Sequence, residues 1–300
     1  MSLEDFTNEV TKKLEGVLGI GYTVCNQKVT RNNGIVRHAI IISDRKTNIS
    51  PCIYVDEDYE EFIRGKADLD DIAQRIYDIY QQSRIMHNFD VTRFMNWESV
   101  KSRIGCRLVN TEKNAERLKE LPHREYLDLS LIYYALVEDA DTQNKVRGSV
   151  QIYNDHMRSW GIDENTLYEV AWSNMKKIDE ASFDPMLNVI AGMIGEKAFE
   201  SDDAIPMYVL SSKSKVNGAV YIYDHEELQK ASEYLQDDFW ILPSSTHETI
   251  LIPYKSAPDC LRYLSSMVRE VNAAEVADDE ILSDHVYKYE RTEDRIIIAA

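Results

Sequence analysis

The most informative absence from this 300-residue sequence is that of the glycine-rich loops that bind nucleotides. Neither Gly-x-Gly-x-x-Gly nor Gly-x-x-x-x-Gly-Lys occurs, which excludes the two commonest phosphate-binding loops. No apolar run is long enough to cross a bilayer, and the first residues, Met1–Asp5, are acidic where a secretory signal is basic and then apolar. We therefore expect a cytoplasmic protein that does not bind membranes.

Cysteine is scarce and dispersed. The sequence has 4 cysteines, with no Cys-x-x-Cys pair and no histidine at zinc-site spacing. This pattern disfavours structural zinc and a disulfide scaffold, and it fits a reduced compartment. The acidic run Asp56-Glu57-Asp58 lacks the glycine and the distal glutamate of a calcium loop. We therefore expect no metal site and no cofactor.

Basic residues are few in the second half of the chain. The whole sequence has 34 Lys plus Arg against 52 Asp plus Glu, a net charge of −18. Residues 1–150 contribute 21 − 24 = −3, and residues 151–300 contribute 13 − 28 = −15. Such a surface repels phosphate backbones, so we expect no direct binding to nucleic acid. A solvated surface explains the charge; the sharper alternative is an acidic inhibitor of a nucleic-acid-binding protein.

A seven-residue pattern occurs twice, 218 − 148 = 70 positions apart. Gly148–Asn154 and Gly218–Asp224 share Gly, a small residue, Val, any residue, Ile, Tyr, and then Asn or Asp. Glycine suits the end of a tight turn, β-branched and aromatic residues favour a strand, and Asn or Asp caps a following helix. Each copy therefore predicts a turn, a strand and a helix capped by Asn154 or Asp224.

The first part of the chain predicts a compact α+β lobe over residues 1–90. Ser2 is placed to cap a helix, and Asn33-Gly34 is a strong hairpin signal because both residues tolerate positive φ. The expected elements are a helix from Ser2, strands at 22–30, 35–43 and 49–55, acidic helical sequence at 56–65, and an amphipathic helix at 68–83. Residues 91–104 are interpreted as a connecting segment.

Residues 105–300 predict a larger lobe of repeated β-β-α units. The expected strand pairs are 126–137 with 149–153, 207–211 with 219–223, and 239–242 with 249–252, followed by helices at 154–160 and 163–177, after Asp224, and through 261–271. A final hairpin is expected at 287–291 and 295–299. The fold class is therefore α+β, with a mainly antiparallel sheet and helices on one face. The other sheet face would be solvated or would bind a ligand.

One local string carries the residue types of a hydrolytic site. Ser244, Ser245, His247 and Glu248 supply hydroxyls, an imidazole and a carboxylate. The nucleophile elbow Gly-x-Ser-x-Gly is missing, and Leu251 stands where a zincin has its second histidine. A hairpin turn accounts for the same string, because Pro and Ser favour turns.

The repeat also nominates binding residues. Tyr153 and Tyr223 hold the same position in its two copies, and His156 and His225 follow just after them. Tyrosine is enriched at interfaces, although it is also an ordinary sheet residue. The sequence therefore places a candidate binding edge at these four residues.

Several strings together resemble an uncharacterised bacterial family, a domain of unknown function found in anaerobic, gut-type bacteria. They are Asn33-Gly34 with His38, Ile49–Tyr54, Pro122-His123 leading to Leu127–Leu129, Trp160–Ile162 with Leu167–Glu169, Pro206–Ser211, Leu242–Ser245 with His247-Glu248, and Leu282–Asp284 with Val286-Tyr287. The resemblance covers nearly the whole chain and implies one bacterial protein built end to end. It brings no assigned activity, so it transfers no catalytic or binding residue.

These observations favour a non-enzymatic cytoplasmic module that binds a protein or a small ligand through its C-terminal sheet. Every specific catalytic motif is absent, the strands are rich in tyrosine, and the chain is acidic. A hydrolase using Ser244 or Ser245 with His247 and Glu248 remains an alternative, as does the acidic inhibitor. The sequence does not determine the oligomeric state.

Overall fold

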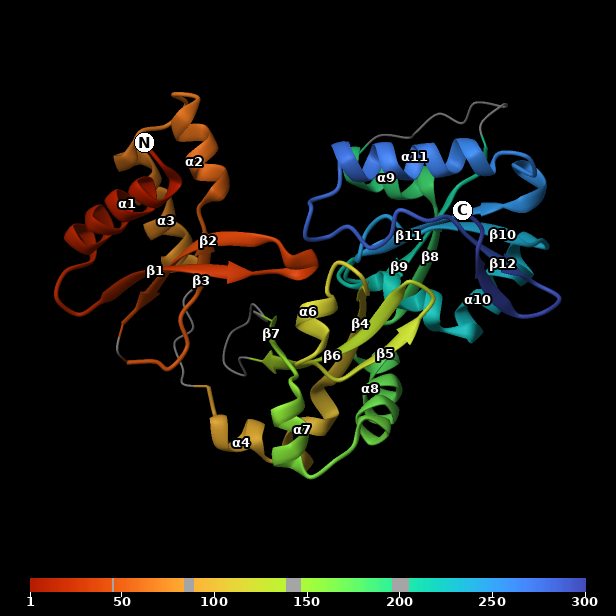
Figure 1. Cartoon of the computed structure of the whole chain (residues 1–300), viewed down its shortest axis with the longest axis horizontal. Coiled ribbons are helices and arrows are strands. Elements are labelled where there is room, and N and C mark those ends of the chain that lie inside the picture. The colour runs from red at the N-terminus through yellow and green to blue at the C-terminus, as the bar shows by residue number, and fades with distance from the viewer. Residues whose placement is uncertain (45, 84–88, 139–146, 196–204) are drawn as a thin grey trace. The chain divides into compact units, whose positions relative to one another are not determined.

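The computed structural model describes residues 1–44, 46–83, 89–138, 147–195 and 205–300 (Figure 1). The chain divides into two compact units, one of residues 1–94 with 137–148 and the other of residues 95–136 with 149–300. Helices and antiparallel sheets occur in both, which confirms the α+β class. Among the described residues, no helix has the length and apolar character needed to span a bilayer.

The first unit packs helices on one face of a three-stranded antiparallel sheet. Its elements are α1 (Leu3–Leu18), β1 (Thr23–Thr30), β2 (Val36–Ser43), β3 (Cys52–Tyr54), α2 (Asp56–Ile63) and α3 (Leu69–Ser83). Ser2 caps α1 as predicted, because its hydroxyl accepts a hydrogen bond from the Asp5 backbone N–H. Asn33 and Gly34 both have positive φ, as the hairpin signal required. The core joins Phe6 and Leu14 of α1 to Ile40 of β2 and Ile76 of α3.

A four-stranded sheet begins the second unit. Its strands are β4 (Ile104–Asn110), β5 (His123–Tyr126), β6 (Leu129–Glu138) and β7 (Arg147–Gln151), and its helices are α5 (Trp97–Val100), α6 (Ala115–Leu118), α7 (Asn154–Trp160) and α8 (Glu164–Ile178). The short helix α4 (Val91–Met95) precedes them and belongs to the first unit except for its last residue. β6 pairs with β4 on one side and with β5 on the other. One face packs Ile132 and Val109 against Leu118 of α6. The opposite face meets α8, where Met175 sulfur accepts the Cys106 N–H.

A six-stranded antiparallel sheet forms the rest of the second unit, in the order β13-β12-β10-β11-β9-β8. Its elements are β8 (Ala181–Pro185), α9 (Met186–Ile194), β9 (Tyr208–Ser212), α10 (His225–Leu235), β10 (Phe239–Leu242), β11 (Glu248–Pro253), α11 (Leu261–Ala274), β12 (Tyr287–Glu290) and β13 (Arg295–Ile298). α11 covers one face, where Leu264 and Val268 pack on Trp240. α10 lies on the other face of the sheet (Figure 1), and its Tyr234 contacts Tyr208 of β9.

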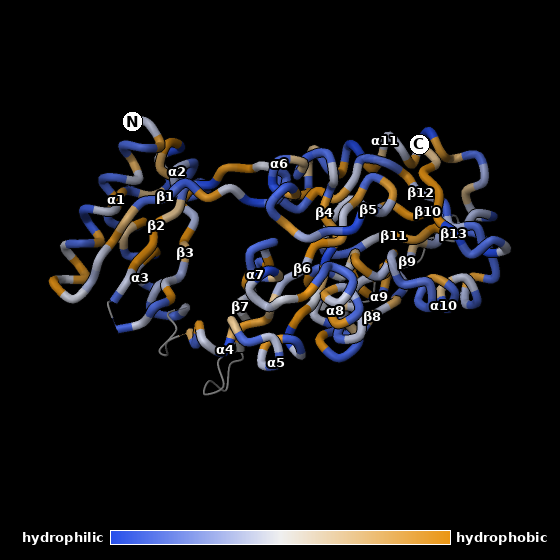
Figure 2. The backbone as a smooth tube through the Cα atoms, turned by 60° about the horizontal axis from the view of Figure 1, so that its bottom comes forward, coloured by the Kyte–Doolittle hydropathy of each residue, from blue (hydrophilic) through white to orange (hydrophobic). Residues whose placement is uncertain are grey.

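Helices therefore cover both faces of this sheet, where one covered face was expected. The reason is visible in β10, whose residues Phe239–Leu242 are all apolar and all buried. A strand with no polar alternation needs cover on both sides. Figure 2 shows the mixed hydrophobic and hydrophilic course of α10, which suits a helix with one buried face.

The strand predicted at residues 219–223 is wrong. Residues Gly218–Tyr223 form a short 3-10 helix, η3, and all but Tyr223 are buried. β9 cannot take it as a partner, because β8 and β11 already pair with its two edges. β8, which the sequence did not indicate, supplies the missing strand. The two copies of the repeat thus differ in structure, since Gly148–Gln151 lies in β7.

Two further boundaries differ from the expectation. The single strand predicted over 126–137 is split into β5 and β6 by a turn at Leu127, which has φ 59°. Asn154 is the first residue of α7, and Tyr153 takes the cap position that was expected for Asn154. The backbone N–H of Tyr153 donates to His156 Nδ1 at 3.1 Å. Asp224 does cap α10, accepting the Glu226 N–H at 3.0 Å.

Candidate functional site

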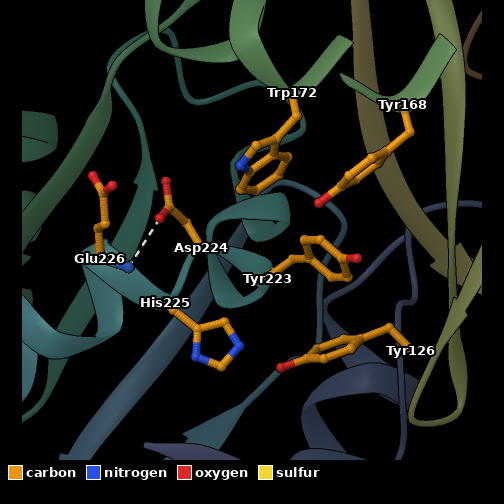
Figure 3. A pocket seen from close by; sticks show the side chains of 7 residues that line it. All are labelled: Tyr126, Tyr168, Trp172, Tyr223, Asp224, His225 and Glu226. Carbon is orange, nitrogen blue, oxygen red and sulfur yellow. Dashed lines mark hydrogen bonds between the residues drawn. The ribbon is translucent and has the colours of Figure 1, made fainter. Parts of the chain in front are cut away.

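A pocket of about 330 Å³ opens in the second unit where β5, α8 and the junction of η3 with α10 meet (Figure 3). It is lined by Tyr126, Tyr168, Trp172, Tyr223, Asp224, His225 and Glu226. Its volume lies at the lower end of the range of roughly 300–1,000 Å³ that is typical of small-molecule sites.

Helix α8 contributes one stripe of side chains to this site. Glu164, Tyr168, Trp172 and Lys176 follow one another at intervals of four residues, so they lie along the same side of the helix. β5 contributes Tyr126, which lies on the same strand face as Arg124, and Arg124 bonds Glu164 of α8. The stripe and the strand together hold the pocket's aromatic side chains opposite the end of η3.

Three aromatic rings surround that of Tyr223. Its ring centroid lies 4.8 Å from Tyr126, 5.2 Å from Trp172 and 6.2 Å from Tyr168, with interplanar angles of 72°, 73° and 78°. Tyr168 and Trp172 are nearly parallel, at 14°. All four side chains are half-buried, so each retains part of its surface at the pocket. The rings hold one another in place and leave apolar surface accessible.

Arg124 packs on the ring of Tyr168. The guanidinium carbon lies 3.7 Å from the centre of the Tyr168 ring, and Arg124 Nε donates to the two Glu164 oxygens at 2.8 and 3.1 Å. The Tyr133 hydroxyl also donates to Glu164. The bond to Glu164 raises the pKa of Arg124 despite partial burial, so this cation remains neutralised by its own partner.

The opposite rim of the pocket is acidic. Lys176 Nζ bonds Glu226 and lies 3.9 Å from the buried Asp224 carboxylate. This contact raises the pKa of Lys176 and lowers that of Glu226. His225 Nδ1 lies 3.3 Å from Asp294 at the turn between β12 and β13. Burial, followed by the neighbouring Tyr223 and Asp294, raises the pKa of Tyr126 to about 12.

Two of the four predicted binding residues line this pocket. Tyr223 is at its centre and His225 at its rim. Tyr153 and His156 lie elsewhere in the unit, where they contact each other and His156 contacts Trp160. The structure therefore does not bring the two halves of the repeat to a common edge. Tyr126, Tyr168 and Trp172 were not among the candidates, although aromatic residues four positions apart in the predicted helix 163–177 were an available signal.

The hydrolase candidates do not form a nucleophile and base. His247 Nδ1 accepts the Asn217 N–H at 3.1 Å, and its Nε2 lies 3.2 Å from Glu280. Ser245 Oγ accepts the backbone N–H of His247, while Ser244 is buried and Glu248 begins β11. Within the described ranges, no hydrogen bond joins either serine hydroxyl to the imidazole. These contacts stabilise the turn between β10 and β11.

A second group of Ser, His and Asp side chains lies at the β5–β6 turn. Ser283 Oγ donates to Asp128 Oδ2 at 2.7 Å, and His285 Nδ1 lies 2.9 Å from the same oxygen. A catalytic triad needs the serine to donate to the imidazole, with the acid on the far ring nitrogen. Here Ser283 is fully buried and bonds the acid directly, so the group joins the two sheets. In the described part of the chain, no set of three His, Cys, Asp or Glu side chains is arranged to hold a metal ion.

The fold and the pocket define an α+β protein whose second unit carries an aromatic site with an acidic rim. Residues 3–291 match the model of the family of unknown function DUF5688, so the chain belongs to this family. That match confirms the expectation of a family of unknown function that covers nearly the whole chain. No curated protein and no solved structure matches the chain.

Proposed function

We propose that this protein is a binding module that holds a small ligand in the aromatic pocket of its second unit. The observation that carries the proposal is the meeting of four half-buried aromatic rings in one concave site. Concave, mainly apolar sites with a few polar groups at the edge are the usual form of ligand pockets.

The chemistry of the lining supports binding in preference to catalysis. Proton-transfer catalysis requires an acid or base available to the substrate, and nucleophilic catalysis requires a nucleophile activated by a neighbouring base, a lowered pKa or a metal. The titratable groups at the rim are instead paired with each other: Glu226 with Lys176, and His225 with Asp294. Aromatic side chains offer large contact areas with only two side-chain torsions to restrict, which suits recognition.

A fragment screen tests this proposal. Ligand-observed NMR with a mixture of small aromatic, aliphatic and amine fragments is run on the wild type and on Tyr223→Ala, with far-UV circular dichroism to check folding. We expect a subset of fragments to bind the wild type and to lose binding in Tyr223→Ala.

The matched control is Tyr153→Ala, which removes the tyrosine at the equivalent position of the repeat, outside the pocket lining. It should bind the same fragments as the wild type. If Tyr223→Ala folds and binds the same fragments as the wild type, the pocket is not the binding site. Trp172→Ala provides a second variant should Tyr223→Ala not fold.

A further inference from the structure

We propose that the group recognised by the pocket is an alkylated ammonium, such as the trimethylammonium group of a choline-like small ligand. The inference rests on the proposed function, because it names the chemical class of the ligand in the same pocket. Three features of the described residues carry it: the ring arrangement, the charge of the rim and the occupation of the rim's hydrogen-bond acceptors.

The planes of neighbouring aromatic rings in the pocket cross at large angles. Trp172 and Tyr126 cross the plane of Tyr223 at 73° and 72°, with centroids within 5.2 Å. Figure 3 shows these side chains coming from three separate elements toward one site. The face of an aromatic ring carries negative electrostatic potential, and sets of such rings bind quaternary ammonium groups. A compact cation at this corner would contact more than one ring.

The rim has an excess of negative charge. Asp224 and Glu226 line the pocket, and Asp294 lies next to His225. Lys176 is the ammonium that contacts this group, so the formal sum of the three carboxylates and this ammonium is 1 − 3 = −2. Arg124 does not change the balance, because Glu164 neutralises it. A cation is therefore stabilised electrostatically at this site, and an anion is repelled.

Each carboxylate at the rim already accepts a hydrogen bond or an ion pair, and an alkylated ammonium leaves these partners in place. A primary ammonium has three N–H donors that need acceptors when they leave water. Asp224 accepts the Glu226 N–H, Glu226 is bonded to Lys176, and Asp294 accepts the Tyr289 hydroxyl and the Gln229 amide. A quaternary ammonium has no N–H to satisfy, and its methyl groups carry the charge to the ring faces. It can be held without displacing any of these partners.

The test compares ligands that differ only in charge or in alkylation. Choline and 3,3-dimethylbutan-1-ol have the same shape, but the second has carbon in place of the cationic nitrogen. Tetramethylammonium and methylammonium separate an alkylated cation from a primary one. Binding is followed by NMR on the indole N–H resonance of Trp172, which is assigned by its disappearance in Trp172→Phe.

We expect choline to shift this resonance saturably and to bind about 2- to 30-fold more tightly than its neutral analogue. Tetramethylammonium should bind more tightly than methylammonium. Tyr223→Ala should abolish the saturable shift, and Tyr153→Ala should leave it intact. Glu226→Gln should weaken choline binding about 2- to 5-fold, since it removes one rim charge. Glu116→Gln is its control, because Glu116 is also an exposed glutamate paired with a lysine.

Equal binding of choline and its neutral analogue would overturn the inference, as would tighter binding of methylammonium than of tetramethylammonium. If no ammonium binds but fragments still distinguish the wild type from Tyr223→Ala, the ligand class is wrong and the pocket stands. If neither ligands nor fragments distinguish these two proteins, the proposed function fails as well.

Discussion

Replacing Asp128 with asparagine should destabilise the second unit strongly, because this carboxylate joins its two sheets. Asp128 lies in the turn between β5 and β6, and its oxygens accept hydrogen bonds from Ser283, His285 and Tyr287 at the start of β12. Ser283 and Tyr287 are fully buried, so their hydroxyls cannot turn to water when the acceptor is lost.

The expected loss follows from the number of bonds. Asparagine keeps one acceptor oxygen and replaces the other with an NH2 group, so one or two bonds to a charged acceptor are lost. Such bonds contribute about 1.5–3 kcal/mol each, and the Asp128 side chain is only 20% exposed. We predict that the free energy of unfolding falls by about 2–4 kcal/mol, which lowers the Tm by roughly 5–15 °C.

The assay is urea unfolding followed by tryptophan fluorescence. All 4 tryptophans, Trp97, Trp160, Trp172 and Trp240, lie in the second unit, so the signal reports on that unit alone. Asp155→Asn is the control, because Asp155 is 76% exposed and pairs with Arg158 at the surface. It should cost less than about 1 kcal/mol. If Asp128→Asn costs no more than the control, the assigned role of Asp128 is wrong.

The same variant predicts a pH dependence. Burial alone would raise the pKa of Asp128, but the hydrogen bonds from Ser283, Tyr287 and His285 outweigh it and lower the pKa. Because the pKa of Asp128 is lower in the folded state, its ionised form stabilises the fold at any pH above the unfolded-state pKa of about 3.9. This stabilisation is lost as the pH falls through the folded-state pKa. The stability difference between wild type and Asp128→Asn should therefore persist at pH 5–7, by about 2–4 kcal/mol, and shrink below about pH 4.

Three further predictions concern local packing. Gly218→Ala should lower the free energy of unfolding by about 2–4 kcal/mol in the same assay, because a Cβ there would lie 2.2 Å from Ser212 N and 2.7 Å from His247 O; an unchanged midpoint would contradict the tight packing of η3. Gly16→Ala, with no atom near the added methyl, should instead stabilise the first unit by about 0.5–1 kcal/mol, measured by far-UV circular dichroism. In native thiol labelling, Cys25 and Cys52 should react and Cys106 should not, because Cys106 is buried and burial raises its pKa; labelling of Cys106 before unfolding would show that this core opens.

Local chemistry made much of the secondary structure predictable. The Ser2 cap, the Asn33-Gly34 turn and the Asp224 cap all occur, because each depends on residues close together in the chain. The run Phe239–Leu242 is apolar at every position, and this pattern indicates a strand that is covered on both faces of the sheet. The error at 219–223 arose because a sequence with strand propensity becomes a strand only where a sheet edge is open to it.

Part of the candidate site was likewise predictable from the sequence, and part depended on the tertiary structure. Tyr223 and His225 were found through the repeat, and the charge excess of the second half was evident from composition. What the sequence determined by itself was the α+β class, the acidic character and the local caps and turns, since these depend on near neighbours and on counts. Only the tertiary structure decided that Tyr126, Tyr168 and Trp172 surround Tyr223, because their contacts join residues up to 223 − 126 = 97 positions apart, and burial across such separations depends on how the sheets and helices pack.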